Sequence, residues 1–335
     1  MEFETRPLGR TGLSVTTLGL GCATLGGNME HVPDDAGRTL VIGAYDTGVR
    51  YFDTAAFYGY GKSEHLVGDA LRGQDRSTFV LSSKVGRLMR PRRVPQDPND
   101  LWKNPLPFEP IYDYSYDGVM RSYEDSMQRL GMNRIDILYI HSLDVHDQGS
   151  REAQQKAFRV AMDDTYRALD ELRRTGEIKA IGLGINEAPP IVEAFNHGDW
   201  DVFLLAGRYT LLEQEPLAAV FPAVEKNGAS IVVGGPFNSG VLVGRQTWNY
   251  GKIPPAVMEK VTRIANICDA HKVPLAAAAL QFPLAHPVVK SIIPGPQSAA
   301  EFNQIVAWWK TPIPAALWQD LKAEGVLDKA APVPT

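Results

Sequence analysis

The sequence predicts a closed barrel of eight parallel β-strands that alternate with helices. Eight short apolar segments are spaced along the chain, and helical patterns lie between them. The segments are largely apolar rather than alternating, which indicates strands buried on both faces of a parallel sheet. Polar residues follow several segments, at the strand ends where barrel enzymes place their active sites. The expected strands span residues 17–21, 49–52, 78–83, 135–140, 178–184, 201–206, 230–234 and 289–293.

The elements follow in a regular order. Residues 5–21 are expected to form a small hairpin with a glycine-containing turn near its middle. Further along the chain, apolar residues recur at intervals of three and four before Gly131, Gly176 and Gly228. Glycine just past a helix can take the left-handed conformation that ends it, so each pattern predicts a helix.

A doubly wound open sheet is the rival fold. That fold normally has fewer strands and often carries a G-x-G-x-x-G motif after the first, which is missing from this sequence. Residues 85–117 and 142–160 are expected to be long loops, and long loops in a compact domain are usually functional. Together with 236–252 and 324–335 they should shape a pocket. We see no linker or repeat, so residues 1–335 are expected to form a single domain.

Composition limits the classes of function. The chain has 335 residues, 44% hydrophobic and 22% charged, with a net charge of −5. This charge gives no general attraction to nucleic acid or to anionic lipid. Cys22 and Cys268 are too few for a disulfide framework. The N-terminus lacks the apolar core of a signal peptide, and no apolar run is long enough to span a membrane, so we expect a cytoplasmic protein.

Chemistry-bearing residues gather at the predicted strand ends. Asp53, Lys84 and His141 each end an apolar segment, and Asn186 follows another. Tyr58 lies five residues after Asp53 in a glycine-rich loop. Any one of these residues could be structural, but in a parallel barrel all of them would open on one face. The sequence therefore predicts an active site there.

These side chains suit proton transfer. A nearby ammonium favours the phenolate form of a tyrosine, so Lys84 should lower the pKa of Tyr58, with Asp53 holding Lys84 in place. His141 could then orient a substrate oxygen. No serine or cysteine stands beside a base as an activated nucleophile. We therefore expect carbonyl–alcohol interconversion, which needs a hydride carrier.

Other motifs have weaker support. Gly61-Lys62-Ser63 resembles the end of a P-loop, but Ala56 stands where the required glycine should be. His141, Asp144, His146 and Asp147 fit no common metal spacing, so no metal is expected. The basic cluster of Arg87, Arg90, Arg92 and Arg93 is expected to be a solvated loop, with an anion contact as the alternative.

The motifs resemble those of the aldo-keto reductase superfamily over nearly the whole chain. They are PLGRTGLSVTTLGLG at 7–21, FDTAAFYGYGKSE at 52–64, SSK at 82–84, GLGIN at 182–186 and SIIPGPQ at 291–297. The resemblance implies a (β/α)₈ TIM barrel with an N-terminal bottom hairpin and long loops at the C-terminal face. It also implies a catalytic tetrad of Asp53, Tyr58, Lys84 and His141, and a nicotinamide cofactor that lies across the strand ends.

The resemblance also implies cofactor-binding residues, some of them atypical. Asn186 matches the residue that holds the nicotinamide carboxamide, whereas Ala206 replaces the usual glutamine. Gly234 and its neighbours replace the usual stacking aromatic residue, for which Phe237 or Tyr209 could substitute. NAD is expected rather than NADP, because Gly295 and Glu301 stand where Lys and Arg usually grip the 2′-phosphate. The expected cofactor-binding residues are Asn186, Tyr209, Gly234, Pro236, Asn238, Ser239, Pro294, Gly295, Gln297 and Glu301.

Two further motifs, LLAGRYTLLEQ at 204–214 and GGPFNSGVL at 234–242, resemble one branch of the superfamily. That branch contains L-fucose (D-threo-aldose 1-) dehydrogenase and pyridoxal 4-dehydrogenase, and it implies oxidation of a cyclic hemiacetal to a lactone with NAD. A sugar ranks slightly above pyridoxal, because Asn238 and Ser239 suit hydroxyl-rich substrates. The alternatives are an NADPH-dependent aldehyde or ketone reductase, and a redox-sensing binding module similar to channel β-subunits. The oligomeric state stays open.

Overall fold

The computed structural model describes residues 2–28, 30–97, 100–249 and 251–335. Within these residues, eight strands form one parallel sheet in the order β12-β11-β10-β9-β8-β5-β4-β3. A parallel bridge between Leu18 and Ile292 joins the two edges, so the sheet closes on itself as the sequence predicted. The strands are β3 (Leu20–Gly21), β4 (Tyr51–Asp53), β5 (Val80–Val85), β8 (Ile137–His141), β9 (Ala180–Ile185), β10 (Val202–Ala206), β11 (Ser230–Gly234) and β12 (Val289–Ile293).

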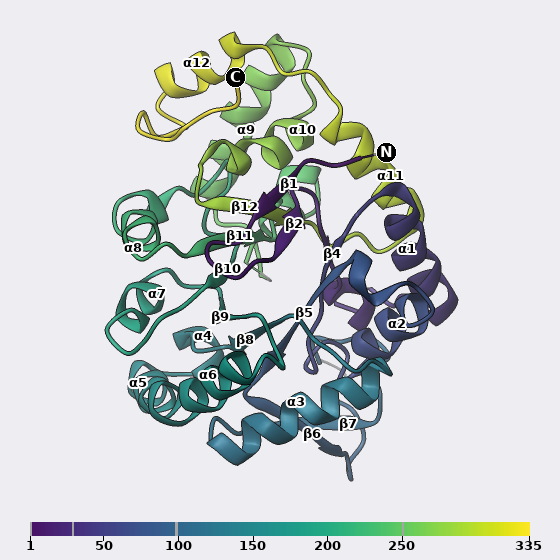
Figure 1. Ribbon diagram of the computed structural model, residues 1–335. Helices are drawn as coiled ribbons and strands as arrows, with labels where there is room; N and C mark the ends of the chain where they lie inside the picture. Colours follow the sequence, from purple (N-terminus) through teal and green to yellow (C-terminus); the bar gives the residue numbers. More distant parts are fainter. Residues whose placement is uncertain (1, 29, 98–99, 250) are drawn as a thin grey trace.

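Helices surround the barrel on its outer side (Figure 1). Helix α3 shows why they form: Ser115 caps its start by accepting from Gly118 N at 3.1 Å, and Gly131 ends it with φ 62°. The helices are α1 (Asp34–Thr47), α2 (Lys62–Leu71), α3 (Tyr116–Leu130), α4 (Val145–Gln148), α5 (Arg151–Val160), α6 (Tyr166–Thr175), α7 (Pro189–Ala194), α8 (Val220–Lys226), α9 (Pro255–Ala270), α10 (Leu275–Gln281), α11 (Ala299–Trp309) and α12 (Ala315–Ala323).

The two expected long loops carry structure of their own. Residues 85–117 contain an antiparallel hairpin of β6 (Arg87–Pro91) and β7 (Phe108–Tyr112). The expectation of a loop over 142–160 was wrong, because α4 and α5 lie there and α5 runs through a π-helical turn into α6. The sequence of α5 gave little warning, since only Gln154 and Phe158 of its ten residues are buried.

The N-terminal hairpin closes one end of the barrel, as expected. Strands β1 (Thr5–Pro7) and β2 (Ser14–Thr16) pair antiparallel and lie in front of the barrel in Figure 1. Leu8 and Val15 pack into the small core inside the barrel, against residues such as Tyr51 and Ile137. This hairpin leaves the carboxyl ends of the strands free at the opposite end.

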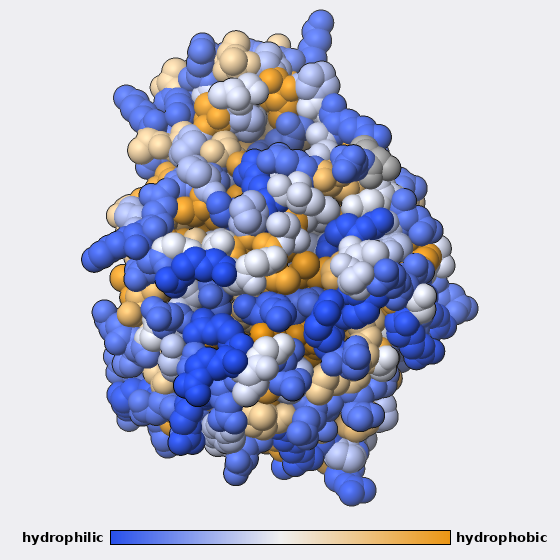
Figure 2. All heavy atoms as spheres, in the orientation of Figure 1, coloured by the Kyte–Doolittle hydropathy of each residue, from blue (hydrophilic) through white to orange (hydrophobic). Residues whose placement is uncertain are grey.

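A second and larger core lies between the barrel and its helices. On the face shown in Figure 2, hydrophilic residues cover most of the surface, and hydrophobic residues appear only in small separate areas. No helix among the described residues is long and apolar enough to cross a membrane.

Candidate active site

A buried ion pair lies at the carboxyl ends of β4 and β5. Lys84 Nζ donates to Asp53 Oδ2 at 2.6 Å and to the carbonyl oxygen of Thr54 at 2.9 Å. The other carboxylate oxygen of Asp53 accepts from Ser82 Oγ at 2.7 Å. Both side chains of the ion pair are almost fully buried. The pair is thus fixed in position, because each charge is desolvated and has specific partners.

Tyr58 lies directly above this pair. Lys84 Nζ is 4.7 Å from the centre of the Tyr58 ring. The loop that carries Tyr58 is held against residues 23–26: a Cβ on Gly59 would lie only 2.6 Å from Gly26 Cα. Gly59 also has φ 62°, in the left-handed region that favours glycine. Close backbone packing therefore fixes the position of Tyr58 relative to the strand ends.

The protonation state of Tyr58 differs from the expectation. Burial and the Asp53 carboxylate raise the pKa of Tyr58 well above its ordinary value. The expectation that Lys84 lowers this pKa was wrong, because the ammonium is hydrogen-bonded to Asp53 and Thr54 and lies over the ring face. Tyr58 is consequently a neutral phenol at neutral pH.

His141 ends β8 beside Tyr58, and their ring centres are 5.8 Å apart. Burial lowers the pKa of His141 well below its ordinary value, and the positive charges of Arg87 and Lys84 act in the same direction. The imidazole is therefore neutral, with one nitrogen able to donate and the other to accept. The structure brings all four residues of the expected tetrad together.

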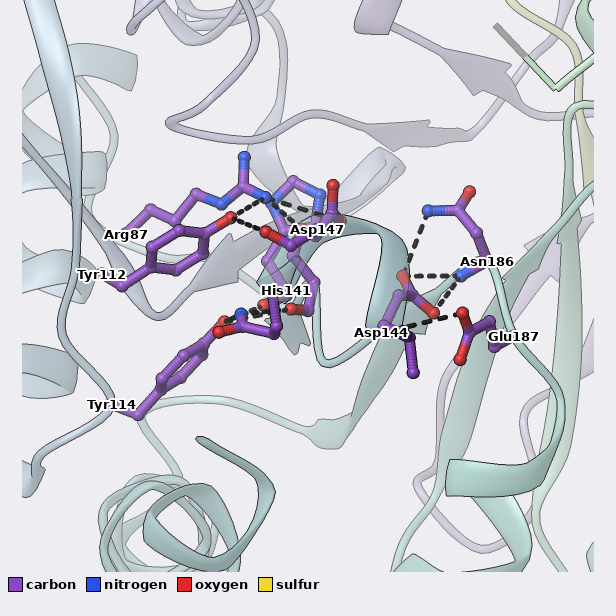
Figure 3. A network of polar contacts seen from close by, with 11 residues as sticks. Arg87, Tyr112, Tyr114, His141, Asp144, Asp147, Asn186 and Glu187 are labelled. Atoms are coloured by element: carbon purple, nitrogen blue, oxygen red, sulfur yellow. Dashed lines mark hydrogen bonds and ion pairs between the residues drawn. The ribbon is translucent and has the colours of Figure 1, made fainter. Parts of the chain in front are cut away.

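Asn186 follows β9 and is held by Asp144, an acid that no local sequence pattern connects with it. Both carboxylate oxygens of Asp144 accept from Asn186 N at 3.0 Å, and Oδ2 also accepts from Asn186 Nδ2 at 3.2 Å (Figure 3). Arg208 Nε donates to the Asn186 carbonyl oxygen at 2.6 Å. Burial raises the pKa of Asp144 to about 7. The orientation of Asn186 thus depends on Asp144.

Gly234 ends β11 and is buried, so no side chain stands where the resemblance places a stacking aromatic ring. A Cβ at Gly234 would lie 3.2 Å from Leu204 Cδ2, so a larger side chain there would crowd the barrel interior. Neither expected substitute for the stacking ring faces the site. Phe237 packs edge-on against Trp308, with 5.9 Å between ring centres. Tyr209 is fully buried, with its ring centre 4.6 Å from that of Phe221.

The other expected residues of this segment take different positions. Pro236 and Asn238 are buried, and Asn238 Nδ2 donates to the carbonyl oxygen of Gly207 at 3.1 Å. Asn238 Oδ1 is buried without a hydrogen-bond partner among the described residues. Ser239 is partly exposed, with φ 59°. An orphaned acceptor fits a polar ligand in this segment.

The turn between β12 and α11 holds the remaining expected residues. Pro294 is buried and Gly295 is exposed. Gln297 N donates to Glu301 Oε2 at 2.9 Å. Arg245 Nη2, which the sequence analysis missed, donates to Gln297 Oε1 at 2.9 Å and to Glu301 Oε1 at 2.8 Å. Glu301 is therefore engaged on both oxygens, and an arginine lies beside it.

Aromatic residues lie next to the tetrad. The Phe57 ring centre is 5.3 Å from that of Trp102 and 6.0 Å from that of His141. Trp102 also lies 5.7 Å from Tyr58, and its indole N–H is buried without a partner among the described residues. Neither residue was predicted, because single aromatic residues in a loop carry no periodic signal.

Arg87 contradicts the expectation of a solvated basic loop. Its side chain is only 4% exposed, and its guanidinium carbon lies 3.7 Å from the centre of the Phe57 ring. Hairpin β6–β7 turns this arginine inward, whereas Arg90 on the same strand is exposed and pairs with Glu109 at 2.7 Å. The other part of the cluster, Arg92 and Arg93, is partly or fully exposed.

The discarded motifs have structural roles. Lys62 Nζ donates to the carbonyl oxygen of Val32 and pairs with Asp34, each at 3.0 Å, so it is not free to bind phosphate. No group of three or more His, Cys, Asp or Glu side chains that could hold a metal ion occurs in the described part of the chain.

Comparisons with known proteins agree with this geometry. The family model described as Aldo/keto reductase family matches residues 17–324. Pyridoxal 4-dehydrogenase of Microbacterium luteolum is 44% identical, with 97% of this chain and 98% of the relative covered. D-threo-aldose 1-dehydrogenase of a Pseudomonas species is 36% identical, with 92% and 94% covered. An aldo-keto reductase of Bacillus halodurans, solved in its holo form, superimposes with a TM-score of 0.76 at 25% identity, covering 98% of both chains.

Proposed function

The chain belongs to the aldo/keto reductase family, and from this premise we propose that it oxidises a cyclic hemiacetal to its lactone with NAD. It is an oxidoreductase of small molecules that uses a nicotinamide cofactor. Two similar relatives are named for the oxidation of pyridoxal and of an aldose. Both kinds of molecule close into rings whose hemiacetal carbon carries a hydroxyl group and a hydrogen. The proposed substrate is therefore pyridoxal or an aldose of the L-fucose or L-galactose type.

One observation carries the proposal: Tyr58 and His141 lie side by side above the buried Asp53–Lys84 pair. In the proposed reaction, His141 donates an N–H to the hemiacetal hydroxyl oxygen and holds it. Tyr58 first loses its own proton to solvent and, as the phenolate, takes up the hydroxyl proton as the C–H bond breaks and the lactone C=O bond forms. When bound, the oxidised nicotinamide accepts the hydride and adds a positive charge that favours phenolate. The buried ion pair holds Tyr58 in position to reach the substrate oxygen.

The residues of the strand ends fit a nicotinamide cofactor. Asn186 follows β9, the strand that pairs with the strand of His141, and is the proposed contact for the nicotinamide amide. Gly295 is exposed and leaves the β12–α11 turn accessible. Gln297 and Glu301 are the proposed contacts for the adenosine part. We propose NAD over NADP, because Glu301 would repel a 2′-phosphate.

An NADPH-dependent carbonyl reductase is the second candidate, favoured by one observation. Arg245 lies 2.8 Å from Glu301 and could contact a phosphate if that ion pair opened. Initial rates with both cofactors, in both reaction directions, separate the two candidates.

The direct experiment incubates the enzyme with NAD and, in turn, pyridoxal, L-fucose and L-galactose. Carbon NMR of the product should show a lactone from at least one of them, with a higher kcat/KM for NAD than for NADP. Conversion of open-chain alcohols or carbonyl compounds alone, with no lactone from any hemiacetal, would contradict the proposal.

A further inference from the structure

Arg87 is a buried cation whose hydrogen-bonding capacity is only partly used. Among the described residues, its polar contacts are made by Nη2, which donates to Tyr112 Oη at 3.0 Å and to Ser142 Oγ at 2.5 Å and lies 3.5 Å from Asp147 Oδ2 (Figure 3). Nε is buried and has no hydrogen-bond partner in the described part of the chain. A buried donor left unpaired costs free energy, so an acceptor on a bound ligand would stabilise Nε.

The guanidinium is held in place by two aromatic rings. Its central carbon lies 3.7 Å from the Phe57 ring centre and 4.8 Å from the Tyr112 ring centre. Stacking of this kind fixes the plane of an arginine and leaves its edges for hydrogen bonds. Arg87 is therefore a preorganised donor rather than a mobile surface charge.

Arg87 also lies next to the reacting groups. Phe57, which it covers, is the ring that contacts His141 at 6.0 Å. The positive charge of Arg87 is among the causes that depress the pKa of His141, and it also opposes the rise in the pKa of Tyr58. A substrate whose hemiacetal oxygen contacts Tyr58 and His141 would place its neighbouring atoms near this cation.

The rings beside the tetrad are flat and aromatic. Trp102 contacts both Phe57 and Tyr58, and these rings suit a planar ring better than a hydroxyl-covered sugar. Asn238, which supported the sugar when only the sequence was considered, is buried and donates to Gly207. The charged group that stacks on these rings is instead the Arg87 cation.

We propose that Arg87 binds an ionised hydroxyl group on an aromatic ring, next to the ring carbon that carries the hemiacetal, and so selects an aromatic hemiacetal over a neutral sugar. This inference rests on the proposed function and names the substrate class of that same site. Among the candidate substrates, pyridoxal has such an acidic ring hydroxyl, and L-fucose and L-galactose do not. Arg87 is then a specificity-determining residue, whereas Tyr58 and His141 act on the reacting oxygen.

A structural role for Arg87 would make a different prediction. Its Nη2 contacts join hairpin β6–β7 to residues 142–147, so loss of the side chain could disturb every substrate equally. Arg90 provides the matched control: it lies on the same strand, carries the same charge, and pairs with Glu109 at the surface.

The test uses two substrates that differ in one group, pyridoxal and its analogue without the ring hydroxyl, with NAD as acceptor and L-fucose for comparison. Arg87→Met should lower kcat/KM for pyridoxal roughly 10- to 100-fold, which is the usual contribution of a hydrogen bond to a charged group. It should change kcat/KM for the analogue by less than about 3-fold. Arg90→Met should leave the ratio of the kcat/KM values for the two substrates unchanged. Circular dichroism and thermal unfolding check that each variant is folded.

Equal losses of kcat/KM for pyridoxal and its analogue in Arg87→Met would overturn the inference in favour of a structural role. A wild-type enzyme that oxidises L-fucose but neither aromatic substrate would also overturn it, while leaving hemiacetal oxidation intact. Calorimetric binding of the lactone of pyridoxal and of its analogue supplies a readout that needs no turnover. Tighter binding of the hydroxylated lactone, lost in Arg87→Met, would support the inference even if no hemiacetal were oxidised and the proposed function failed.

Discussion

Lys84 Nζ lies 2.6 Å from Asp53 Oδ2, and both side chains are shielded from solvent at the carboxyl ends of adjacent strands. Removing one member of a buried pair leaves the other charge without compensation. We expect Lys84→Met to lower the free energy of unfolding by about 3–5 kcal/mol. Urea unfolding measures the loss, and adding Asp53→Asn to the same chain should recover part of it. A double variant as unstable as the sum of the two single variants would argue against coupling.

The second prediction concerns the proposed proton-transfer group. Tyr58→Phe removes only the hydroxyl, and the ring can keep its contacts with Trp102 and His141. We expect kcat to fall by roughly 10²–10⁴, the usual contribution of general acid–base catalysis, with little change in NAD affinity. Steady-state kinetics and fluorescence titration measure the two quantities. A variant that kept near-wild-type kcat would show that another group moves the proton.

The raised pKa of Tyr58 gives a pH dependence of definite sign. Burial keeps the phenol protonated at neutral pH, whereas oxidation requires it to accept a proton. The rate of lactone formation should therefore rise with pH above neutrality, whereas the reverse reaction, which needs the protonated phenol, should change little until the pH approaches the raised pKa of Tyr58. Initial rates of both reactions against pH test this. A forward rate that is already constant across neutral and alkaline pH would contradict it.

The contact between Arg245 and Glu301 leads to a prediction about cofactor choice. Glu301→Gln removes the negative charge but keeps an oxygen that can accept from Gln297 N. Arg245 then becomes available to a 2′-phosphate, so kcat/KM for NADP should rise roughly 10-fold, with a smaller change for NAD. Arg245→Met in the Glu301→Gln background is the control and should remove the gain. A wild-type enzyme that already prefers NADP would refute the proposed role of Glu301.

Sequence analysis could place the tetrad because each member stands at a position fixed by local pattern. Asp53, Lys84 and His141 end apolar runs, and strand ends of a parallel barrel meet on one face. The same reasoning fixed the N-terminal hairpin, whose glycine-containing turn separates two short strands.

The contacts that orient these residues lie far apart in the chain, and no local pattern reveals them. Asp144 and Asn186 are 42 residues apart, and Arg245 and Glu301 are 56 apart. Which arginine of a basic loop turns inward depends on the register of hairpin β6–β7 and on its packing against residues 142–147. The pKa of Tyr58 was misjudged for a related reason, since burial outweighs the neighbouring charge and only the fold determines burial.

The last prediction uses the hydrogen bonds between Asp144 and Asn186, the proposed contact for the nicotinamide amide. Burial raises the pKa of Asp144 to about 7, from an ordinary value of 3.8. Below this pH the folded protein holds a proton on the carboxyl group, and one oxygen that accepts from Asn186 becomes a donor. The KM for NAD should therefore increase as the pH falls from about 8 to about 6, because Asn186 is held less firmly.

Two variants test this dependence. Asp144→Asn mimics the protonated form, and its KM for NAD should be high and nearly independent of pH over the same range. Glu187→Gln removes one of the negative charges that raise the pKa of Asp144, yet keeps an oxygen that can accept from Val145 N. Its KM for NAD should rise only at a lower pH than in the wild type. With one negative charge fewer nearby, the pKa of Asp144 is lower, so its carboxylate stays ionised to a lower pH. Unshifted profiles in both variants would show that another group controls the pH dependence of cofactor binding.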